Sequence, residues 1–420
     1  MADKNTNEII SVIDIGTTKI IVLVAEYNLE QNKISKIIGF GESYSDGLKR
    51  GVVVDISKTI NSITLAVESA EKQSGFEISH AFVGISGDHI SSLNYSGVTS
   101  INANSQNHAV GHSITNEDIE KVQELAANIN ISPDRRIMHI LPQEYIVDDQ
   151  EGISSPLGLS GRRLEAKVHL VTSSINTEKD ILTCLDEIGI NVIEFILEPL
   201  ASAYSVLNPD EMKLGSILID IGGGTTDVIS YANGSVLHTG VVPIGGTIIT
   251  NDIAYRVQTS LEQAEELKQL YGSSNLDEAN PNDDIVVKGV AGRNEFKISQ
   301  KILSEVIEPR VKEIFELVKA EIEKTDFKGD YTFGIILTGG GSKLDGLVKS
   351  AFEVFNMPIK KGLPISDFEV ENIEIDILDP RYSTAIGLIK YSGQNFNNYN
   401  KIKKNSFIEI IKNFIKELIK

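Results

Sequence analysis

The chain has 420 residues, 41% of them hydrophobic, and a formal net charge of −20 at pH 7. This length exceeds what one hydrophobic core usually organises, so two or more domains are expected, and the strong negative charge argues against a nucleic-acid partner. The single cysteine, Cys184, excludes an internal disulfide. No signal-peptide-like segment and no run of about twenty apolar residues occurs, so a cytoplasmic protein is expected.

A turn rich in glycine and threonine separates the first two strand-like apolar runs. It comprises Asp14, Gly16, Thr17, Thr18 and Lys19. Glycine lets backbone N–H groups approach an anion closely, and threonine hydroxyls add further donors. An aspartate at the end of the entering strand can hold a cation, in a magnesium site usually through water. The turn is predicted to bind phosphate, with Lys19 either a phosphate ligand or an exposed cation.

A second copy of this turn follows a later apolar run. It comprises Asp220, Gly222, Gly223, Gly224 and Thr225. Each copy is followed by further strand-like runs and then by a helix, predicted at 57–74 in the first half and from Asp252 in the second. A single Asp-x-Gly turn is common for steric reasons alone. Two copies at the same place in a longer repeat indicate an internal duplication.

Duplicated halves of this kind resemble the actin/Hsp70/sugar-kinase superfamily. The resemblance implies an α/β fold with two ribonuclease H-like domains, and ATP with Mg²⁺ clamped between the two turns. The metal would be held by Asp14 and Asp220, and the phosphates by the glycines and threonines. Neither a P-loop nor a complete dinucleotide Gly-x-Gly-x-x-Gly motif occurs in the sequence.

A Glu-Pro pair between the turns resembles the connecting segment of the superfamily, where helices from both halves cross. The pair is Glu198 and Pro199, followed by small residues. Glu198 is a candidate catalytic residue, because a carboxylate there would orient the metal-bound or attacking water. An ordinary helix start explains the same residues, since proline suits the first turn and a carboxylate favours the helix N-terminus.

Two further elements are candidates for contact with the nucleoside. A glycine run after a buried strand looks like the adenosine motif of the superfamily and comprises Gly339, Gly340, Gly341 and Ser342. Glu265 and Lys268 lie one turn apart on a predicted helix. Relatives use such a pair to touch ribose and base, and the alternative is a solvated ion pair.

The segment between Val83 and Leu164 indicates which family of the superfamily the chain resembles. It contains the string Pro142-Gln-Glu-Tyr145 and continues through Gly152, Pro156, Gly158 and Gly161. This pattern is similar to the FtsA family of bacterial cell-division proteins, which carry an inserted subdomain at this point. The resemblance covers about the first 392 residues and the C-terminus, and departures such as Leu159, where the family often has methionine, are small.

The FtsA resemblance implies a division into four subdomains. Subdomain 1A would comprise 7–82, 165–199 and 379–392, the inserted subdomain 1C 83–164, subdomain 2A 200–240 with 300–378, and subdomain 2B 241–299. It also implies that the C-terminal tail of the tubulin-like protein FtsZ docks on 2B, where Arg293 and Lys297 are candidate counter-charges. Self-association into filaments and contact with other division proteins are expected as well.

The C-terminus changes character after residue 392. Residues 393–405 are rich in asparagine and lysine and are predicted to form a flexible linker. Residues 406–420 predict an amphipathic helix that is too short to span a membrane and suits an anionic membrane surface. Docking on the protein's own core or on a partner is the alternative. The apolar face comprises Phe407, Ile408, Ile410, Ile411, Phe414, Ile415, Leu418 and Ile419.

Taken together, these features predict an ATP-binding, actin-like division protein that polymerises and anchors the FtsZ ring to the cytoplasmic face of the membrane at the division site. Whether ATP is hydrolysed stays open at the level of sequence. The alternatives are an Hsp70-like ATPase, which needs a client-binding domain after the nucleotide domain, and an actin-fold scaffold of the pilus-assembly type. A sugar kinase leaves the basic tail unexplained.

Overall fold

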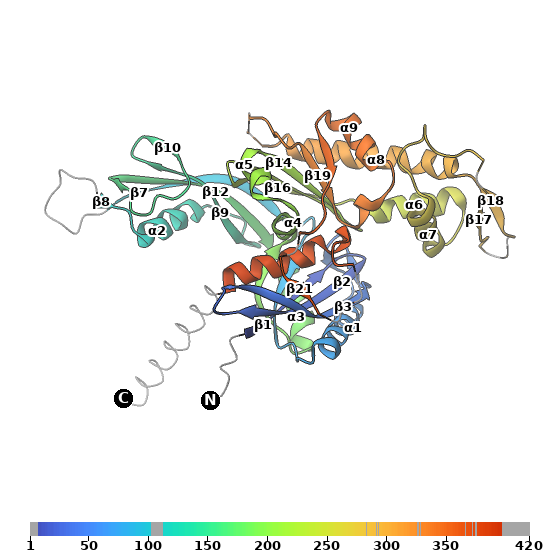
Figure 1. Ribbon diagram of the computed structural model, residues 1–420, viewed down its shortest axis with the longest axis horizontal. Coiled ribbons are helices and arrows are strands. Elements are labelled where there is room, and N and C mark those ends of the chain that lie inside the picture. Colours follow the sequence, from blue (N-terminus) through green and yellow to red (C-terminus); the bar gives the residue numbers. More distant parts are fainter. Residues whose placement is uncertain are drawn as a thin grey trace.

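The computed structural model describes residues 7–101, 112–282, 284–290, 292, 294–325, 327, 329–365, 367–371, 373 and 376–396. Two mixed sheets of the same topology form its centre (Figure 1). The first has the strand order β13-β6-β1-β2-β3-β21 and the second the order β16-β15-β14-β19-β20. In each, three antiparallel strands are followed by parallel neighbours on the other side of the first strand. The predicted duplication is therefore confirmed.

The strands of the two sheets are mostly buried runs of β-branched residues. The first sheet is built from β1 (Asn7–Ile15), β2 (Lys19–Asn28), β3 (Lys33–Tyr44), β6 (His80–Ile85), β13 (Asn191–Leu197) and β21 (Glu369–Val370). The second is built from β14 (Ser216–Ile221), β15 (Thr226–Ala232), β16 (Ser235–Val242), β19 (Ile335–Thr338) and β20 (Ile359–Lys361). A small hairpin, β4 (Leu48–Lys49) with β5 (Val52–Val53), precedes the first long helix.

Helices cover both sheets and provide the apolar faces that close the cores. In the first half these are α1 (Ile56–Ser74) and α3 (Ile175–Glu187), and in the second α8 (Gln300–Ile322) and α9 (Leu347–Phe355). Helix α1 begins at Asp55, whose side chain accepts a hydrogen bond from the Lys58 N–H, and ends at Gly75 in the left-handed conformation. Between the halves lie α4 (Glu198–Val206), α5 (Pro209–Leu214) and a last helix over residues 383–396.

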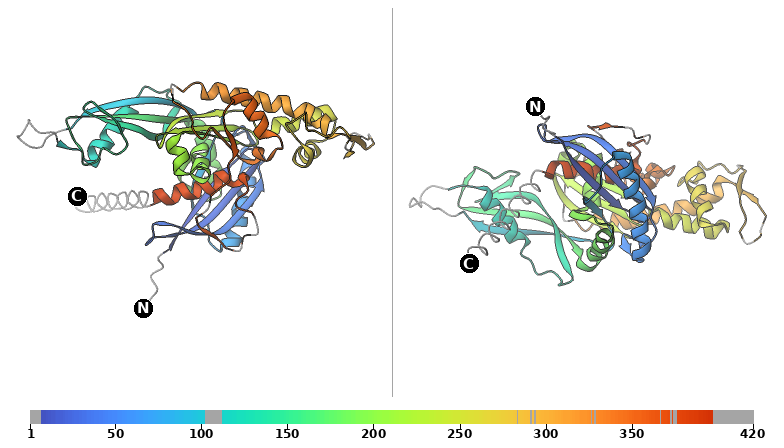
Figure 2. Two further views of the ribbon diagram at one scale, coloured as in Figure 1. Left: turned by 45° about the horizontal axis from the view of Figure 1, so that its top comes forward. Right: turned by 90° about the horizontal axis from the view of Figure 1, so that it is seen from below.

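The inserted subdomain is a four-stranded antiparallel sheet with one helix, and it projects away from the two halves (Figures 1 and 2). It comprises β7 (Ser91–Ser100), α2 (Asn116–Ala127), β9 (Arg135–Val147), β10 (Gln150–Ile153) and β12 (Arg163–Ser174), with the short pair β8 (His112–Ser113) and β11 (Ser160–Gly161). Its bounds differ from the predicted 83–164. Residues 83–85 pair within the first sheet, and β12 pairs with β7 and β9 along its whole length.

A helical extension of the second half lies at the opposite end of the molecule (Figure 1). It comprises α6 (Gly246–Val257), α7 (Leu261–Tyr271), β17 (Ile285–Val287) and β18 (Phe296–Ile298). Among the residues that the structure describes, no helix is both long and apolar enough to cross a membrane.

Two expectations at the C-terminal end need correction. The last helix continues to residue 396, so the first residues of the predicted linker 393–405 are helical. Phe396 is buried, and its ring centroid lies 4.8 Å from that of Tyr27, because the helix packs its apolar face on β2. Strand β21, predicted within subdomain 2A, instead pairs with β3 of the first sheet. The predicted membrane helix, 406–420, lies outside the described residues.

Candidate nucleotide site

The two glycine- and threonine-rich turns face each other across one cavity. Each turn closes with the same hydrogen bond, from Gly16 N–H to Lys19 O and from Gly222 N–H to Thr225 O, both at 3.0 Å. The cavity walls come from both halves. The lining residues are Asp14, Ile15, Gly16, Thr17, Thr18, Lys19, Gly51, Ser86, Glu198, Asp220, Gly222, Gly223, Gly224, Thr225, Asp227, Gly339, Gly340, Arg381 and Thr384.

The turns touch each other directly. A Cβ atom on Gly223 would lie 2.5 Å from Thr18 Oγ1, and one on Gly224 would lie 2.5 Å from Thr17 Oγ1. The cavity has a volume of about 60 Å³, whereas ligand pockets usually measure about 300–1,000 Å³. A nucleotide therefore fits only when the two turns move apart, as domains of duplicated folds can do about a hinge.

Four carboxyl groups meet at the floor of this cavity. They belong to Asp14, Asp220, Asp227 and Glu198. Burial, with Asp220 nearby and Lys19 opposing it, raises the pKa of Asp14 to about 6. Burial, partly offset by a hydrogen bond from Ser86 and reinforced by the other aspartates, raises the pKa of Asp227 to about 8. Removal from water disfavours the charged forms, so this cluster favours a cation beside it.

Asp220 is the most firmly held of the four. Its Oδ2 accepts hydrogen bonds from Ser202 Oγ at 2.6 Å and from Thr384 Oγ1 at 3.3 Å. Burial raises the pKa of Asp220, and these hydrogen bonds oppose that shift. Among the described residues, no group of three His, Cys, Asp or Glu side chains is placed to hold a metal directly. The donor set suits Mg²⁺, which keeps several waters and uses one or two carboxylates with substrate phosphates.

Glu198 opens helix α4 and its half-buried carboxyl group reaches the cavity. Gly84 lies beside it, since a Cβ atom there would be in ordinary contact with Glu198 Cγ at 3.4 Å and would meet Leu388 more closely, at 2.9 Å. Burial, followed by the charges of Asp14, Asp227 and Asp220, raises the pKa of Glu198 well above its ordinary value. The helix-start interpretation is therefore correct as local structure, and the same residue also lines the site.

Only the first two residues of the third glycine run, 339–342, line the cavity. Gly339 and Gly340 line the cavity, and Gly339 has a φ of 82°, which glycine adopts without strain. Gly341 instead packs on Ile221, and the buried Ser342 donates a hydrogen bond to Gly339 O at 2.7 Å. These two residues shape the turn from behind and do not line the cavity.

Glu265 and Lys268 lie beside the second turn, outside the cavity lining. Lys268 Nζ donates to Gly246 O at 3.0 Å, to Thr250 Oγ1 at 2.9 Å and to Glu265 at 2.7 Å. The Gly246 N–H in turn bonds Gly222 O at 2.9 Å. The pair is an ion pair as the alternative stated, and it is only partly solvated, because the Lys268 side chain is 15% exposed and that of Glu265 is 40% exposed.

The Lys19 ammonium group contacts other residues of the protein. It donates to Arg381 O and lies 5.3 Å from the ring centroid of Tyr382.

Two residues that line the cavity, Arg381 and Asp227, were not predicted from the sequence. A signal for Asp227 was present, since a hairpin over the second turn pairs Asp220 with Asp227 in the β14–β15 register and points both side chains the same way. Arg381 offered no such signal.

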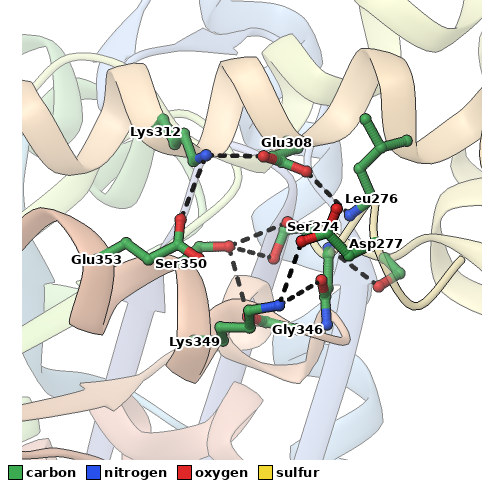
Figure 3. A network of polar contacts seen from close by, with 11 residues as sticks. Ser274, Leu276, Asp277, Glu308, Lys312, Gly346, Lys349, Ser350 and Glu353 are labelled. Atoms are coloured by element: carbon green, nitrogen blue, oxygen red, sulfur yellow. Dashed lines mark hydrogen bonds and ion pairs between the residues drawn. The ribbon is translucent and has the colours of Figure 1, made fainter.

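A polar network joins the third glycine turn to the end of the helical extension (Figure 3). Gly346, with a φ of 76°, lies so close to Asn275 that a Cβ atom would approach it to 2.8 Å. Ser274 N–H bonds Asp345 O at 2.8 Å, and Lys349 Nζ bonds Asn275 Oδ1 at 3.0 Å. The loop after α7 is thereby fixed on α9.

The predicted counter-charges for a partner peptide are not both free. Lys297 forms an ion pair with Asp284 at 2.8 Å, and both side chains are exposed. Arg293 lies outside the described residues.

The fold defines an actin-like protein: two duplicated ribonuclease H-like halves, glycine- and threonine-rich turns that face each other, and an inserted subdomain. Residues 217–387 match the family model "Cell division protein FtsA", and residues 87–172 match "SHS2 domain inserted in FTSA". The chain belongs to the FtsA family of cell-division proteins. The predicted family and fold class are thereby confirmed.

Both related sequences and solved structures support this assignment, the sequences for the family and the structures for the fold. The chain is 42% identical to the cell division protein FtsA of Pseudomonas aeruginosa over 394 residues, 94% of this chain and 91% of that protein. It is 35% identical to FtsA of Escherichia coli K12 over 390 residues, 91% and 90% of the two chains. Solved structures at 14–17% identity share the fold alone. One is the PilM–PilN type IV pilus biogenesis complex, with a TM-score of 0.63 over 92% of this chain and 98% of that chain. Another is MreB5 of Spiroplasma citri bound to ADP, with a TM-score of 0.55 over 93% of this chain and 99% of that chain.

Proposed function

We propose that this FtsA-family protein binds ATP with Mg²⁺ between its two halves. The observation that carries the proposal is the convergence of both turns, three buried aspartates and the half-buried Glu198 on one cavity. Backbone N–H groups and hydroxyls of the two turns would take the phosphates once the turns separate. Solved MreB5 structures of the same fold are bound to ADP and to AMPPNP, which supports a nucleotide in this place.

The residues divide by role in this proposal. Asp14 and Asp220 would hold the magnesium ion, and Glu198 would orient a water in the cavity. Gly339 and Gly340 form the wall on the nucleoside side, backed by Gly341 and Ser342, and Glu265 with Lys268 flanks the same end. When bound, Mg²⁺ supplies positive charge that keeps the buried carboxylates ionised and neutralises the phosphates.

Nucleotide binding is tested by titration of the purified full-length chain with a fluorescent ATP analogue and Mg²⁺. Asp14→Asn and Gly223→Asp should each lower the affinity by about ten-fold or more, the first by weakening the metal site and the second by placing a bulky carboxylate against Thr18. Asp149→Asn, at an exposed position in the inserted subdomain, is the matched control. Unchanged affinity in both site variants contradicts the proposal.

We further propose that the chain anchors the division ring to the cytoplasmic face of the membrane at the division site. Residues 406–420 supply an apolar face for the membrane interface and lysines for anionic headgroups. One short helix binds reversibly, and linking many copies in a filament raises the apparent affinity by roughly a hundred-fold or more. ATP-dependent polymerisation would therefore make attachment persistent.

Membrane binding is tested by co-sedimentation with vesicles of anionic or zwitterionic lipid. Deletion of 406–420 should abolish sedimentation with anionic vesicles, and Phe414→Asp should weaken it, because a carboxylate on the apolar face opposes insertion. Lys412→Arg keeps the charge and serves as the control. Undiminished sedimentation of the deletion variant rejects the helix as the anchor.

The proposed partner at the other end of the molecule is the C-terminal tail of FtsZ, on the helical extension 241–299. The region exposes large apolar side chains that suit a short peptide: Tyr255, Leu261, Leu270, Tyr271, Val286 and Phe296. Because Asp284 already pairs with Lys297, Lys297 contributes little net charge unless that pair opens. Tail-peptide binding should fall on Tyr255→Ala and stay unchanged on Tyr44→Ala, an exposed tyrosine of the first half.

A further inference from the structure

The start of helix α4 lacks the support that helix N-termini normally have. Its N-cap residue is Leu197, which makes no side-chain capping hydrogen bond, and Glu198 is its first residue. In a capping box, the third helical residue accepts a hydrogen bond from the backbone N–H of the N-cap residue. That position is Leu200 here, whose side chain has no acceptor.

The missing acceptor comes from the inserted subdomain. His139, on β9, accepts a hydrogen bond from the Leu197 N–H through Nε2 at 3.0 Å, and both groups are buried. Burial lowers the pKa of His139 to about 4, so its imidazole is neutral and free to accept at physiological pH. The ring also lies edge-on to Tyr391 of the last helix, with centroids 6.2 Å apart. A residue of the inserted subdomain thus holds the N–H of Leu197, the residue immediately before Glu198.

The same strand is attached to the other half of the molecule. Gln143, four positions further along β9, donates to Val236 O at 2.9 Å, and Ser235 Oγ donates to Gln143 O at 2.8 Å. Strand β9 therefore spans from the edge strand β16 of the second sheet to the end of β13 in the first. A displacement of the inserted subdomain relative to the first half would change the geometry of the hydrogen bond between His139 and the Leu197 N–H.

We propose that His139 is a positioning residue that couples the inserted subdomain to the orientation of Glu198 in the nucleotide cavity. The proposal rests on the proposed nucleotide function. A partner that moves the inserted subdomain would change the site through this contact, without touching the nucleotide.

The first test measures hydrogen exchange at the Leu197 amide in the full-length protein. His139→Leu removes the acceptor and should speed exchange there by about five- to ten-fold, while His139→Gln, whose carbonyl can accept, should retain protection. His169→Gln is the matched control, because His169 is equally buried in the adjacent strand but bonds Asn94 and Thr239. Unchanged exchange in His139→Leu, or equal acceleration in the control, overturns the contact.

The second test is a double-mutant cycle with Glu198→Gln. The readouts are the Mg²⁺ dependence of ATP affinity and the single-turnover hydrolysis rate. His139→Leu should shift them in the same direction as Glu198→Gln, by up to roughly ten-fold, because small misplacements of an active group are costly. In the Glu198→Gln background it should have no further effect.

The outcomes distinguish a failure of the positioning role of His139 from a failure of the proposed nucleotide binding. Additive effects of the two substitutions overturn the positioning role and leave the nucleotide site intact. A wild-type protein that binds no ATP overturns the nucleotide function itself. Rescue by His139→Gln together with non-additivity supports the positioning role, since general loss of stability predicts neither.

Discussion

Thr17 of the first turn lies against Gly224 of the second, so closely that a Cβ atom on Gly224 would be 2.5 Å from the Thr17 hydroxyl oxygen. Gly223 has the same relationship to Thr18. These contacts make the glycines of the second turn steric requirements of the packed halves as well as candidate phosphate ligands. The contact between the halves can therefore be tested by substituting these glycines.

Gly224→Ala should lower the free energy of unfolding by about 1–3 kcal/mol, because the added methyl group forces the two turns apart. Denaturant unfolding of the nucleotide-free protein measures this change. Gly340→Ala is the control, since its Cβ would meet only Arg381 Cγ at an ordinary 3.5 Å. Equal stability of Gly224→Ala and the wild type would mean that the turns are not in contact in solution.

The carboxyl cluster predicts a loss of stability with rising pH above neutrality. The pKa of Asp227 is raised by burial to about 8, from 3.8. A raised pKa stabilises the protonated folded state at low pH, and this contribution is lost as the pH rises through the folded pKa. The metal-free protein should therefore be less stable at pH 8.5 than at pH 7, an interval that lies above the ordinary histidine pKa of about 6.5 and includes the raised pKa of Asp227.

Asp227→Asn should reduce this slope between pH 7 and 8.5, because the amide cannot ionise yet still accepts from Ser86. Urea unfolding at several pH values, with and without Mg²⁺, is the measurement, and Mg²⁺ should also flatten the profile if the carboxylates face it. Asp149→Asn should leave the slope as it is in the wild type. A steeper slope in Asp227→Asn would contradict the assignment of the raised pKa.

Phe396→Ala should destabilise the protein by about 3–5 kcal/mol, since it deletes a buried ring that packs on Tyr27. Truncation after residue 396 should leave the unfolding midpoint nearly unchanged, because the packed part of the last helix is retained. Thermal and denaturant unfolding of the two variants measure the difference. A truncation as damaging as the substitution would show that the later residues also stabilise the core.

Lys268→Met should lower the free energy of unfolding by about 2 kcal/mol, because it removes a charged donor shared by three oxygens between α6 and α7. The control is Lys324→Met, which breaks another ion pair of the same spacing whose lysine is 64% exposed; such pairs contribute about 0–1 kcal/mol. ATP affinity of the same variant then tests the ribose contact separately. Equal stability losses would contradict a structural role for Lys268.

Much of the site followed from local sequence. Asp14, Asp220 and the glycines of both turns could be predicted because a turn between two apolar strands dictates its own backbone shape. Asp227 was equally readable from the hairpin register, whereas Arg381 reaches the cavity only through the path of the chain after the second sheet. Glu198 was ambiguous, since a helix start and a site residue use the same Glu-Pro pair.

The sequence by itself determined the duplicated halves and their glycine- and threonine-rich turns, because both are written in short-range spacing and residue type, whereas the inserted subdomain and the family followed from the resemblance to FtsA proteins. Only the tertiary structure decided that Thr17 touches Gly224, that Phe396 belongs to the core, and that His139 accepts a hydrogen bond from the N–H of Leu197, next to Glu198. These contacts join residues far apart in the chain. Their existence depends on how the two sheets and the inserted subdomain pack, which no local preference specifies.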